Sequence, residues 1–153
     1  IPEIERRCVK PAIDKSEING GTPAVAIELN DGRVVTGKTS SLLGASSAAL
    51  LNALKAIAGI DKEIDVISSE ILEPIQKLKT ENLGNHNPRL HTDEVLIALS
   101  ISAATNPLAE LAMEQLSKLR GCDVHSSVIL SQVDERTFKR LGVNLTCQPR
   151  YKA

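Results

Sequence analysis

The chain has 153 residues, 42% of them hydrophobic and 24% charged, which predicts one globular domain with a core and excludes a disordered chain. The net charge is −1 and there is no basic block, so we expect no nucleic-acid partner and no membrane surface. One Phe, one Tyr and no Trp indicate an aliphatic core and leave no aromatic platform for base stacking.

The cysteines and the start of the chain indicate a cytoplasmic fragment. Cys8, Cys122 and Cys147 are widely spaced and form no C-x-x-C pair, which is typical of reduced thiols in the cytoplasm. No apolar run is long enough to span a membrane. The chain begins at Ile1 without Met and without a targeting pattern, so we expect a piece of a longer protein.

The N-terminal region is the least regular. Residues 1–21 mix charge with scattered apolar positions and contain Pro11, a pattern that fits a short helix or an N-terminal strap. Asn19-Gly20-Gly21 predicts its end. Strands are then predicted over 23–29 and 33–36, because the Asp-Gly pair between them is a strong hairpin signal.

Residues 32–39 also match the phosphate-loop pattern G-x-x-x-x-G-K-[ST], with Gly37, Lys38 and Thr39 in place. A working phosphate loop needs a helix that begins at the Lys-Thr step. Three of the four residues inside this match are β-branched, which favours an extended strand. We therefore interpret the match as part of the hairpin and Lys38 as a strand-end residue, with an anionic ligand as its only candidate role.

The middle of the chain predicts a buried helix rich in small residues over 42–60, closed by Gly59. A short strand is expected over 63–67. Pro74 suits the first position of a helix better than its interior, so we expect it to open a helix that ends near Lys79.

A polar loop over 82–94 precedes a strongly apolar helix over 95–104. Asn106 and Pro107 then predict the start of a further helix that ends at Leu119.

The C-terminal region predicts a strand over 124–130, a helix over 131–142 and a final strand over 143–147. The whole chain is therefore expected to form a single α/β (mixed α+β) domain. It would consist of a β-hairpin, several packed helices and a C-terminal β-α-β segment, with the helices packed against a mixed sheet.

Three long stretches are distinctive: "VVTGKTSSLLGASSAALLNALKAIAGI", "NPRLHTDEVLIALSISAATNPLAELAMEQLSKLRGC" and "VHSSVILSQVDERTFKRLGVNLTCQP". They resemble the C-terminal part of a bacterial family known as domain of unknown function 1846, or uncharacterised protein family 0371. The resemblance implies a cytoplasmic protein with mixed α/β structure and a longer N-terminal part. It supplies neither catalytic residues nor a cofactor, and it does not support the label "ATP-dependent peptidase" that some members carry. Whether the protein is an enzyme stays open.

The best candidate site is "GNHNPRLHTDE", residues 84–94, which concentrates His86, Arg89, His91 and Asp93. Arg can hold a carboxylate or phosphate with two hydrogen bonds, and His can transfer a proton near neutral pH. The alternative is a solvated connector whose last residues cap the next helix. The histidines lack the H-E-x-x-H spacing, and no set of three ligands stands out, so no metal is expected.

Two other groups of polar residues have both a structural and a functional interpretation. His125 precedes Ser126 in a predicted strand, where neighbouring side chains point to opposite faces, so His125 cannot readily activate this serine. We interpret His125 as a packed residue, with a catalytic role as the alternative. Ser46, Ser47 and Asn52 interrupt an apolar helix. They either pack that helix tightly or line a cleft shared with the rest of the protein.

Two hypotheses follow. The first is a lobe of an active site that is completed by the N-terminal remainder of the protein. It would bind a small anionic metabolite through Arg89, Asp93 or Lys38, with acid–base chemistry by His86 or His91. We then expect 84–94 at the rim of a cleft, with Arg89 and one of these histidines facing it. The second is a non-catalytic module that packs against the remainder or forms a homo-oligomer. Neither hypothesis identifies the cofactor or the reaction.

Overall fold

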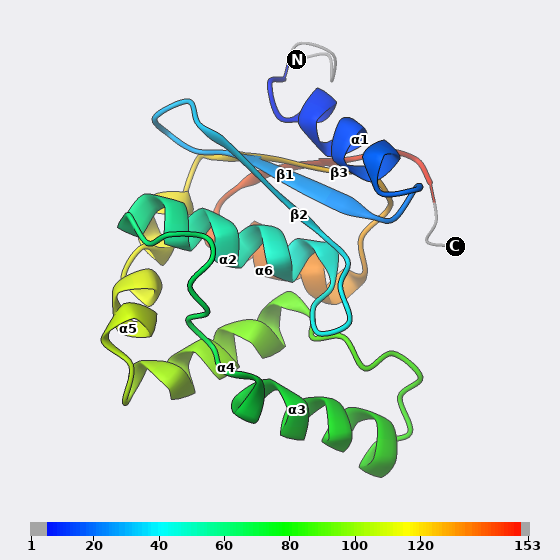
Figure 1. Ribbon diagram of the computed structural model, residues 1–153. Coiled ribbons are helices and arrows are strands. Elements are labelled where there is room, and N and C mark those ends of the chain that lie inside the picture. Colours follow the sequence, from blue (N-terminus) through cyan, green and yellow to red (C-terminus); the bar gives the residue numbers. More distant parts are fainter. Residues whose placement is uncertain (1–5, 151–153) are drawn as a thin grey trace.

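The computed structural model describes residues 6–150 and shows a four-stranded sheet between layers of helices (Figure 1). In chain order the helices and strands are α1 (Val9–Ile18), β1 (Ala24–Glu28), β2 (Val34–Lys38), α2 (Ala45–Ala58), α3 (Ser69–Lys77), α4 (Thr92–Ala103), α5 (Pro107–Met113), β3 (Asp123–Ser126), α6 (Gln132–Leu141) and β4 (Asn144–Cys147). A π-helical segment, Leu78–Asn82, extends α3, and a 3-10 helix, Leu116–Leu119, follows α5. The predicted mixed α+β class is confirmed.

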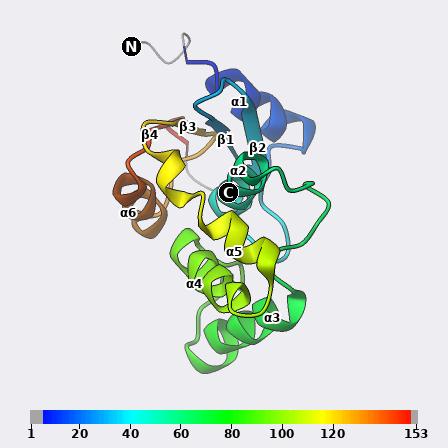
Figure 2. The same cartoon turned by 90° about the vertical axis from the view of Figure 1, so that its left-hand side faces the viewer.

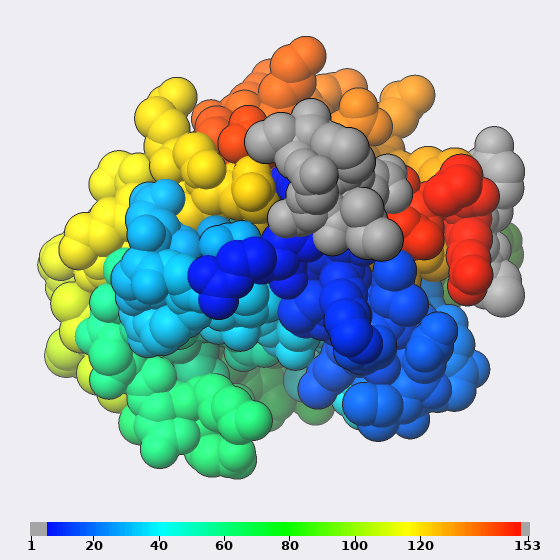
Figure 3. Space-filling model, turned by 90° about the horizontal axis from the view of Figure 1, so that it is seen from above, coloured from blue at the N-terminus to red at the C-terminus, as the bar shows by residue number. Residues whose placement is uncertain are grey.

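The helices form layers on the two faces of the sheet. Helix α1 covers one face of the sheet, and α2 and α6 cover the other (Figure 1). Helices α4 and α5 pack beneath α2, and α3 lies beyond α4 (Figure 2). Seen from the α1 side, the N-terminal helix and the C-terminal segment lie on the same face of the molecule (Figure 3).

The β1–β2 hairpin forms as predicted. The strands are antiparallel, with Ala24 opposite Lys38 and Glu28 opposite Val34. The N–H of Gly32 donates to the carbonyl of Leu29 at 2.9 Å and closes the turn. The residues that match the phosphate-loop pattern are therefore a turn and a strand, and the next helix begins only at α2.

The C-terminal β-α-β segment is also confirmed. Strand β3 pairs antiparallel with β1 and parallel with β4, and α6 joins the two parallel strands. The strand order is β2-β1-β3-β4. As a result, the C-terminal ends of β2, β3 and β4 and the start of β1 lie at the same end of the sheet.

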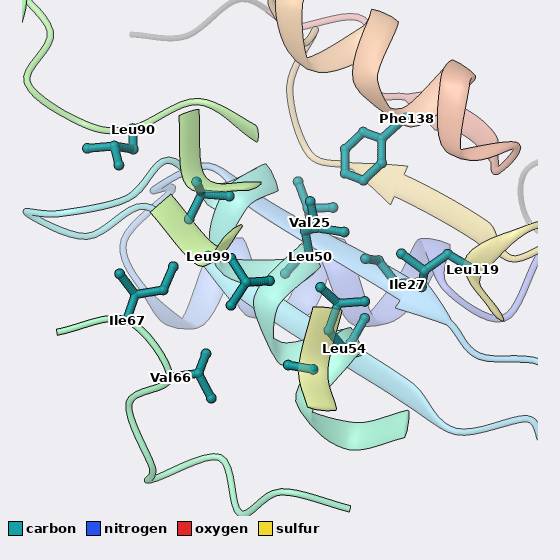
Figure 4. Close-up of a cluster of buried hydrophobic side chains, with 14 of the residues drawn as sticks. Val25, Ile27, Leu50, Leu54, Val66, Ile67, Leu90, Leu99, Leu119 and Phe138 are labelled. Carbon is teal, nitrogen blue, oxygen red and sulfur yellow. The ribbon is translucent and has the colours of Figure 1, made fainter. Parts of the chain in front are cut away.

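The core is aliphatic, as the composition predicts. Side chains of β1, α2, α4 and α6 meet between the sheet and the helices, and the single Phe of the chain, Phe138, is fully buried there (Figure 4). On the other face of the sheet, a small cluster of Cys8, Ala12 and Ala26 packs α1 against β1.

Two predicted elements are wrong. Residues 63–67 form turns rather than a strand, because Asp61 folds the chain back by accepting the N–H of Glu63 at 2.9 Å. The apolar signal there comes from Val66 and Ile67, which are buried in the core without pairing to a strand.

Pro74 lies inside α3 instead of opening a helix, because α3 already begins at Ser69. The amphipathic face of this helix packs on the core through Ile71, Leu72 and Ile75. Pro74 removes one backbone hydrogen bond from the helix. We attribute its tolerance to the burial of the apolar face, which stabilises the helix by more than this loss.

Other boundaries shift. The helix predicted over 42–60 begins at Ala45, because Leu42 and Leu43 instead pair with the backbone of Leu90. The region predicted as a strap contains α1, and residues 1–5 lie outside the described residues.

Candidate functional site

A large hollow lies at the end of the sheet where β2, β3 and β4 end. It measures about 500 Å³. Its walls come from the last turn of α1 and the segment after it, the loop 83–91, and the segments after β2, β3 and β4. The lining residues are Ser16, Gly20, Gly21, Thr22, Pro23, Thr39, Asn87, Arg89, Ser127, Val128 and Arg150. Ligands of open α/β sheets commonly bind outside the carboxyl ends of the strands, which is where this hollow lies.

The side chains that line the hollow make it basic. Among the residues from 6 to 150, Arg89 and Arg150 are the charged ones that line it, and none of its lining residues carries a carboxylate. The Nε of Arg89 donates to the carbonyl of Ser40 at 2.5 Å, and within residues 6–150 its other guanidinium nitrogens make no hydrogen bond. The backbone carbonyl of Arg150 accepts the N–H of Ile129 at 2.6 Å, which ties the segment after β4 to the segment after β3.

A buried ion pair holds the loop 83–91 in place. The ammonium of Lys79, whose side chain is only 5% exposed, donates to the carbonyl of Arg89 at 2.6 Å and to Oε1 of Glu94 at 2.8 Å. The same Oε1 accepts the backbone N–H of His91 at 2.8 Å. Burial alone raises the pKa of the Glu94 carboxyl, but the hydrogen bonds from Lys79 and His91 outweigh it and lower this pKa below its usual value.

A narrow cleft adjoins the hollow and shares Pro23, Asn87, Arg89 and Val128 with it. The cleft measures about 20 Å³, which is room for roughly one water-sized group. It lies where α2, α4 and α6 begin, since the residues that precede these helices, Gly44, His91 and Ser131, all line it.

Two hydroxyl groups beside these cavities have no partner. Ser46 is 2% exposed and lines the cleft, and its Oγ makes no hydrogen bond within the described part of the chain. The Oγ1 of Thr39, which lines the hollow, is likewise buried and without a partner among residues 6–150. Ser47 and Asn52 differ, because they donate to the carbonyls of Leu90 and Thr36 and therefore have the packing role.

The loop that concentrates the predicted site residues lies at the rim of these cavities, as expected. Arg89 lines both of them and His91 lines the cleft. His86 and Asp93 are exposed and line neither cavity. Whether any of the four residues binds a ligand stays a prediction.

Lys38 is also outside the cavities. Its exposed ammonium donates to the side-chain carbonyl of Asn19 at 2.9 Å and joins the end of β2 to the end of α1.

His125 is a packed strand residue, as its position predicts. It is fully buried on the sheet face that α1 covers, beside Ala26. Its Nδ1 lies 2.6 Å from Oγ1 of Thr146, and its Nε2 lies 3.0 Å from Oε1 of Gln148. The hydroxyl of Ser126 donates to the carbonyl of Val128 instead of contacting this histidine.

Metal and thiol chemistry find no support in the described residues. Over 6–150 no three His, Cys, Asp or Glu side chains are grouped so that they could hold a metal ion. Burial raises the pKa of the Cys8 and Cys122 thiols, which disfavours the reactive thiolate. None of the helices in this part of the chain is long and apolar enough to cross a membrane.

The sequence analysis missed several residues of the hollow, above all Arg150, Thr39 and Ser127. The available signal was the predicted β-α-β segment. The carboxyl ends of two parallel strands meet at one edge of a sheet, so the residues after β3 and β4 were candidates from the topology alone.

Comparison with known proteins identifies relatives along nearly the whole chain. A family model described as "Domain of unknown function DUF1846, C-terminal" matches residues 4–153. A UPF0371 protein of Corynebacterium glutamicum is 59% identical over 148 residues, and one of Corynebacterium diphtheriae is 56% identical over 152 residues. A UPF0371 protein of Streptococcus thermophilus is 48% identical over 148 residues. These matches cover 97%, 99% and 97% of this chain but only 30% of each relative.

Proposed function

We propose that this chain, which belongs to the DUF1846 family as its C-terminal domain, is the anion-binding lobe of a longer bacterial protein that acts on a small anionic metabolite. One observation carries the proposal: a hollow of about 500 Å³ is lined by Arg89 and Arg150 and by no carboxylate of the described residues. This volume lies within the range of small-molecule sites in proteins.

The chemistry of the two arginines supports an anionic group. A guanidinium offers a planar fork of donors that matches the oxygens of a carboxylate or phosphate. Arg89 is also held in position, because Lys79 fixes its carbonyl and Ser40 accepts from its Nε. A positioned cation orders fewer side-chain rotamers on binding than a freely rotating one, which favours affinity.

The rest of the active site would come from outside this chain. The chain spans about 30% of the length of the curated relatives it matches, so the N-terminal remainder is the partner we propose. Among the histidines predicted as acid–base residues, only His91 lines the cleft, and we assign proton transfer to it. We place the protein in the cytoplasm, which agrees with the buried thiols of Cys8 and Cys122 outside any disulfide.

A second function, a packing module, is favoured by one observation on α4. Ile97 and Ile101 are 58% and 55% exposed and lie one helical turn apart, so they form an apolar stripe. In the packing hypothesis, this stripe would contact the N-terminal remainder or a second copy of the protein. The two functions are compatible, since a lobe that completes an active site must also pack against its other part.

The test is calorimetric titration of the full-length protein with inorganic phosphate, succinate and glycerol 3-phosphate, and with glycerol as a neutral control. We expect the anions to bind and glycerol not to bind. Arg89→Gln and Arg150→Gln should each weaken anion binding by about tenfold or more, the usual effect of losing a charged hydrogen bond.

Arg136→Gln is the matched control, because Arg136 is an exposed arginine of α6 outside both cavities. Absence of anion binding would refute the proposal. Equal binding by all three variants would also refute it.

A further inference from the structure

We infer that the anion is the phosphoryl group of a phosphate monoester, held at the mouth of the narrow cleft with one oxygen bound by the Ser46 hydroxyl and the first turn of α2. This inference rests on the proposed anion site and specifies its ligand class.

The first step is the state of Ser46. Its Oγ is buried and makes no hydrogen bond with any residue from 6 to 150, although it lines the cleft. A buried hydroxyl without a partner costs about 1–3 kcal/mol, so such groups are rare in stable proteins. A ligand oxygen in the cleft would supply the missing partner.

The second step is the electrostatic character of the cleft. Helices α2, α4 and α6 have 14, 12 and 10 residues and all begin there. The N-terminus of a helix carries about half a positive charge and presents free N–H groups, which is why phosphates bind at such positions.

The third step is that two of these three helix ends are already compensated. The carboxylate of Asp134 accepts the backbone N–H of Thr92 at 2.9 Å, in the first turn of α4. The hydroxyl of Ser131 accepts the N–H of Asp134 at 3.2 Å and caps α6. Helix α2 follows Gly44 and has no side-chain cap among the described residues. Its N-terminus therefore remains the one open to an external anion, and Ser46 is its second residue.

The fourth step distinguishes phosphate from carboxylate. Ser46, the N-terminal residues of α2 and Arg89 all line the cleft, which places three possible donors of hydrogen bonds around it. A phosphoryl group has three terminal oxygens in a tetrahedral arrangement and can contact all three at once, whereas the two oxygens of a carboxylate lie in one plane. Among the described residues one carboxylate lines the cleft, that of Asp134. It accepts hydrogen bonds from the N–H and the hydroxyl of Thr92, which weakens its repulsion of an anion.

The last step is space. The cleft of about 20 Å³ admits one oxygen, and the hollow of about 500 Å³ beside it accommodates the organic part of an ester. Because Arg89 lines both cavities, it would lie beside the ester bond, with the phosphoryl group at the cleft and the organic part in the hollow. This arrangement favours a phosphate monoester over free phosphate.

The experiment is titration of the full-length protein with glycerol 3-phosphate, ribose 5-phosphate and succinate. Both esters should bind at least about tenfold more tightly than succinate. Ser46→Ala should weaken ester binding by about tenfold, the effect of one lost hydrogen bond to a charged group, and leave succinate binding unchanged. Ser46→Asp should abolish ester binding, because it places a negative charge in the cleft.

Ser100→Ala is the control, since Ser100 is an exposed helical serine on α4. A second readout separates ligand binding from a structural role. Without ligand, Ser46→Ala should keep or raise the melting temperature, because it removes a buried hydroxyl that has no partner. Adding ester should raise the melting temperature of Ser46→Ala by less than it raises that of the wild type.

The two proposals fail differently. If esters and succinate bind equally and Ser46→Ala has no effect while Arg89→Gln does, the phosphoryl inference is wrong and the anion site stands. If no anion binds, both proposals are wrong. A lower melting temperature of ligand-free Ser46→Ala would show a structural role and would also overturn the inference.

Discussion

The β1–β2 hairpin and the loop 83–91 each present a basic side chain near turn residues, but they hold it in different surroundings. Lys38 ends an edge strand and is exposed, and its ammonium donates to the side chain of Asn19. Arg89 lies between two cavities, and the buried Lys79 fixes its backbone. At Gly37, next to Lys38, the hairpin packs directly against the backbone of α2, whereas the loop at Arg89 borders an open hollow. A basic residue near a glycine therefore indicates an anion site only where the surrounding packing leaves room for the anion.

The largest expected effect concerns the packing of the hairpin. A Cβ added at Gly37 would lie 2.2 Å from the backbone nitrogen of Ala49, so Gly37→Ala must push β2 away from α2. We expect it to destabilise the domain by about 3 kcal/mol or more. Urea unfolding followed by circular dichroism measures this loss.

The neighbouring Lys38→Ala is the control for the hairpin and should change stability by less than about 0.5 kcal/mol. If Gly37→Ala were as mild as this control, the close packing of β2 on α2 would be wrong. Because the hairpin contributes only Thr39 to the hollow, we expect the folded fraction of Gly37→Ala to bind anions normally.

The second prediction concerns the anchor of the loop. Lys79→Met leaves the carboxylate of Glu94 without its cation and the carbonyl of Arg89 without its donor. Removing one member of a buried ion pair costs about 3–5 kcal/mol, and the partial exposure of Glu94 places the expected loss near about 2–3 kcal/mol. In contrast to the hairpin variant, anion affinity should also fall, because Arg89 loses its fixed position.

Lys10→Met provides the matched control for the anchor. Lys10 forms an exposed ion pair with Asp14 four residues away, and such pairs contribute less than about 1 kcal/mol. An anion affinity that is normal in Lys79→Met would show that the ion pair supports the fold without positioning the site.

The smallest expected effect is a pH dependence confined to the loop. The pKa of Glu94 is lower in the folded protein than its ordinary value of 4.5, so its stabilising contribution is fully present above pH 4.5. That contribution is lost as the pH falls through the lower folded pKa, because protonation removes the charge that Lys79 and His91 bind.

Glu94→Gln should remove this acid-sensitive part of the stability. Unfolding of both proteins between pH 7 and pH 3 would measure the difference. Parallel stability curves would indicate that Glu94 titrates alike in the folded and unfolded states.

Several elements were predictable because their signals are local. Asp31-Gly32 specifies the hairpin turn, and Asn106 caps α5 by accepting the N–H of Leu108 at 3.0 Å. Gly59 and Gly142 end α2 and α6 in the left-handed conformation that glycine adopts without strain. These effects act within a few residues, so the rest of the fold does not need to be known.

The errors occurred where distant contacts decide the structure. Val66 and Ile67 are as apolar as strand residues, but within residues 6–150 they pair with no strand and are buried in the core instead. Pro74 disfavours a helix locally, and only the burial of the α3 face beside it makes the helix stable. Neither outcome can be derived from the neighbouring sequence alone.

The sequence by itself determined the fold class, the hairpin, the β-α-β segment, the aliphatic core and the loop where Arg89 and His91 lie. Only the tertiary structure decided that Arg150, Thr39 and Ser46 join them. Arg150 and Thr39 follow β4 and β2, Ser46 lies in α2, and sheet order and helix packing bring these segments together. Periodicity and capping report on contacts a few residues apart. A cavity is formed by segments that are far apart in the chain, here from residue 16 to residue 150, and its position depends on how every element between them packs.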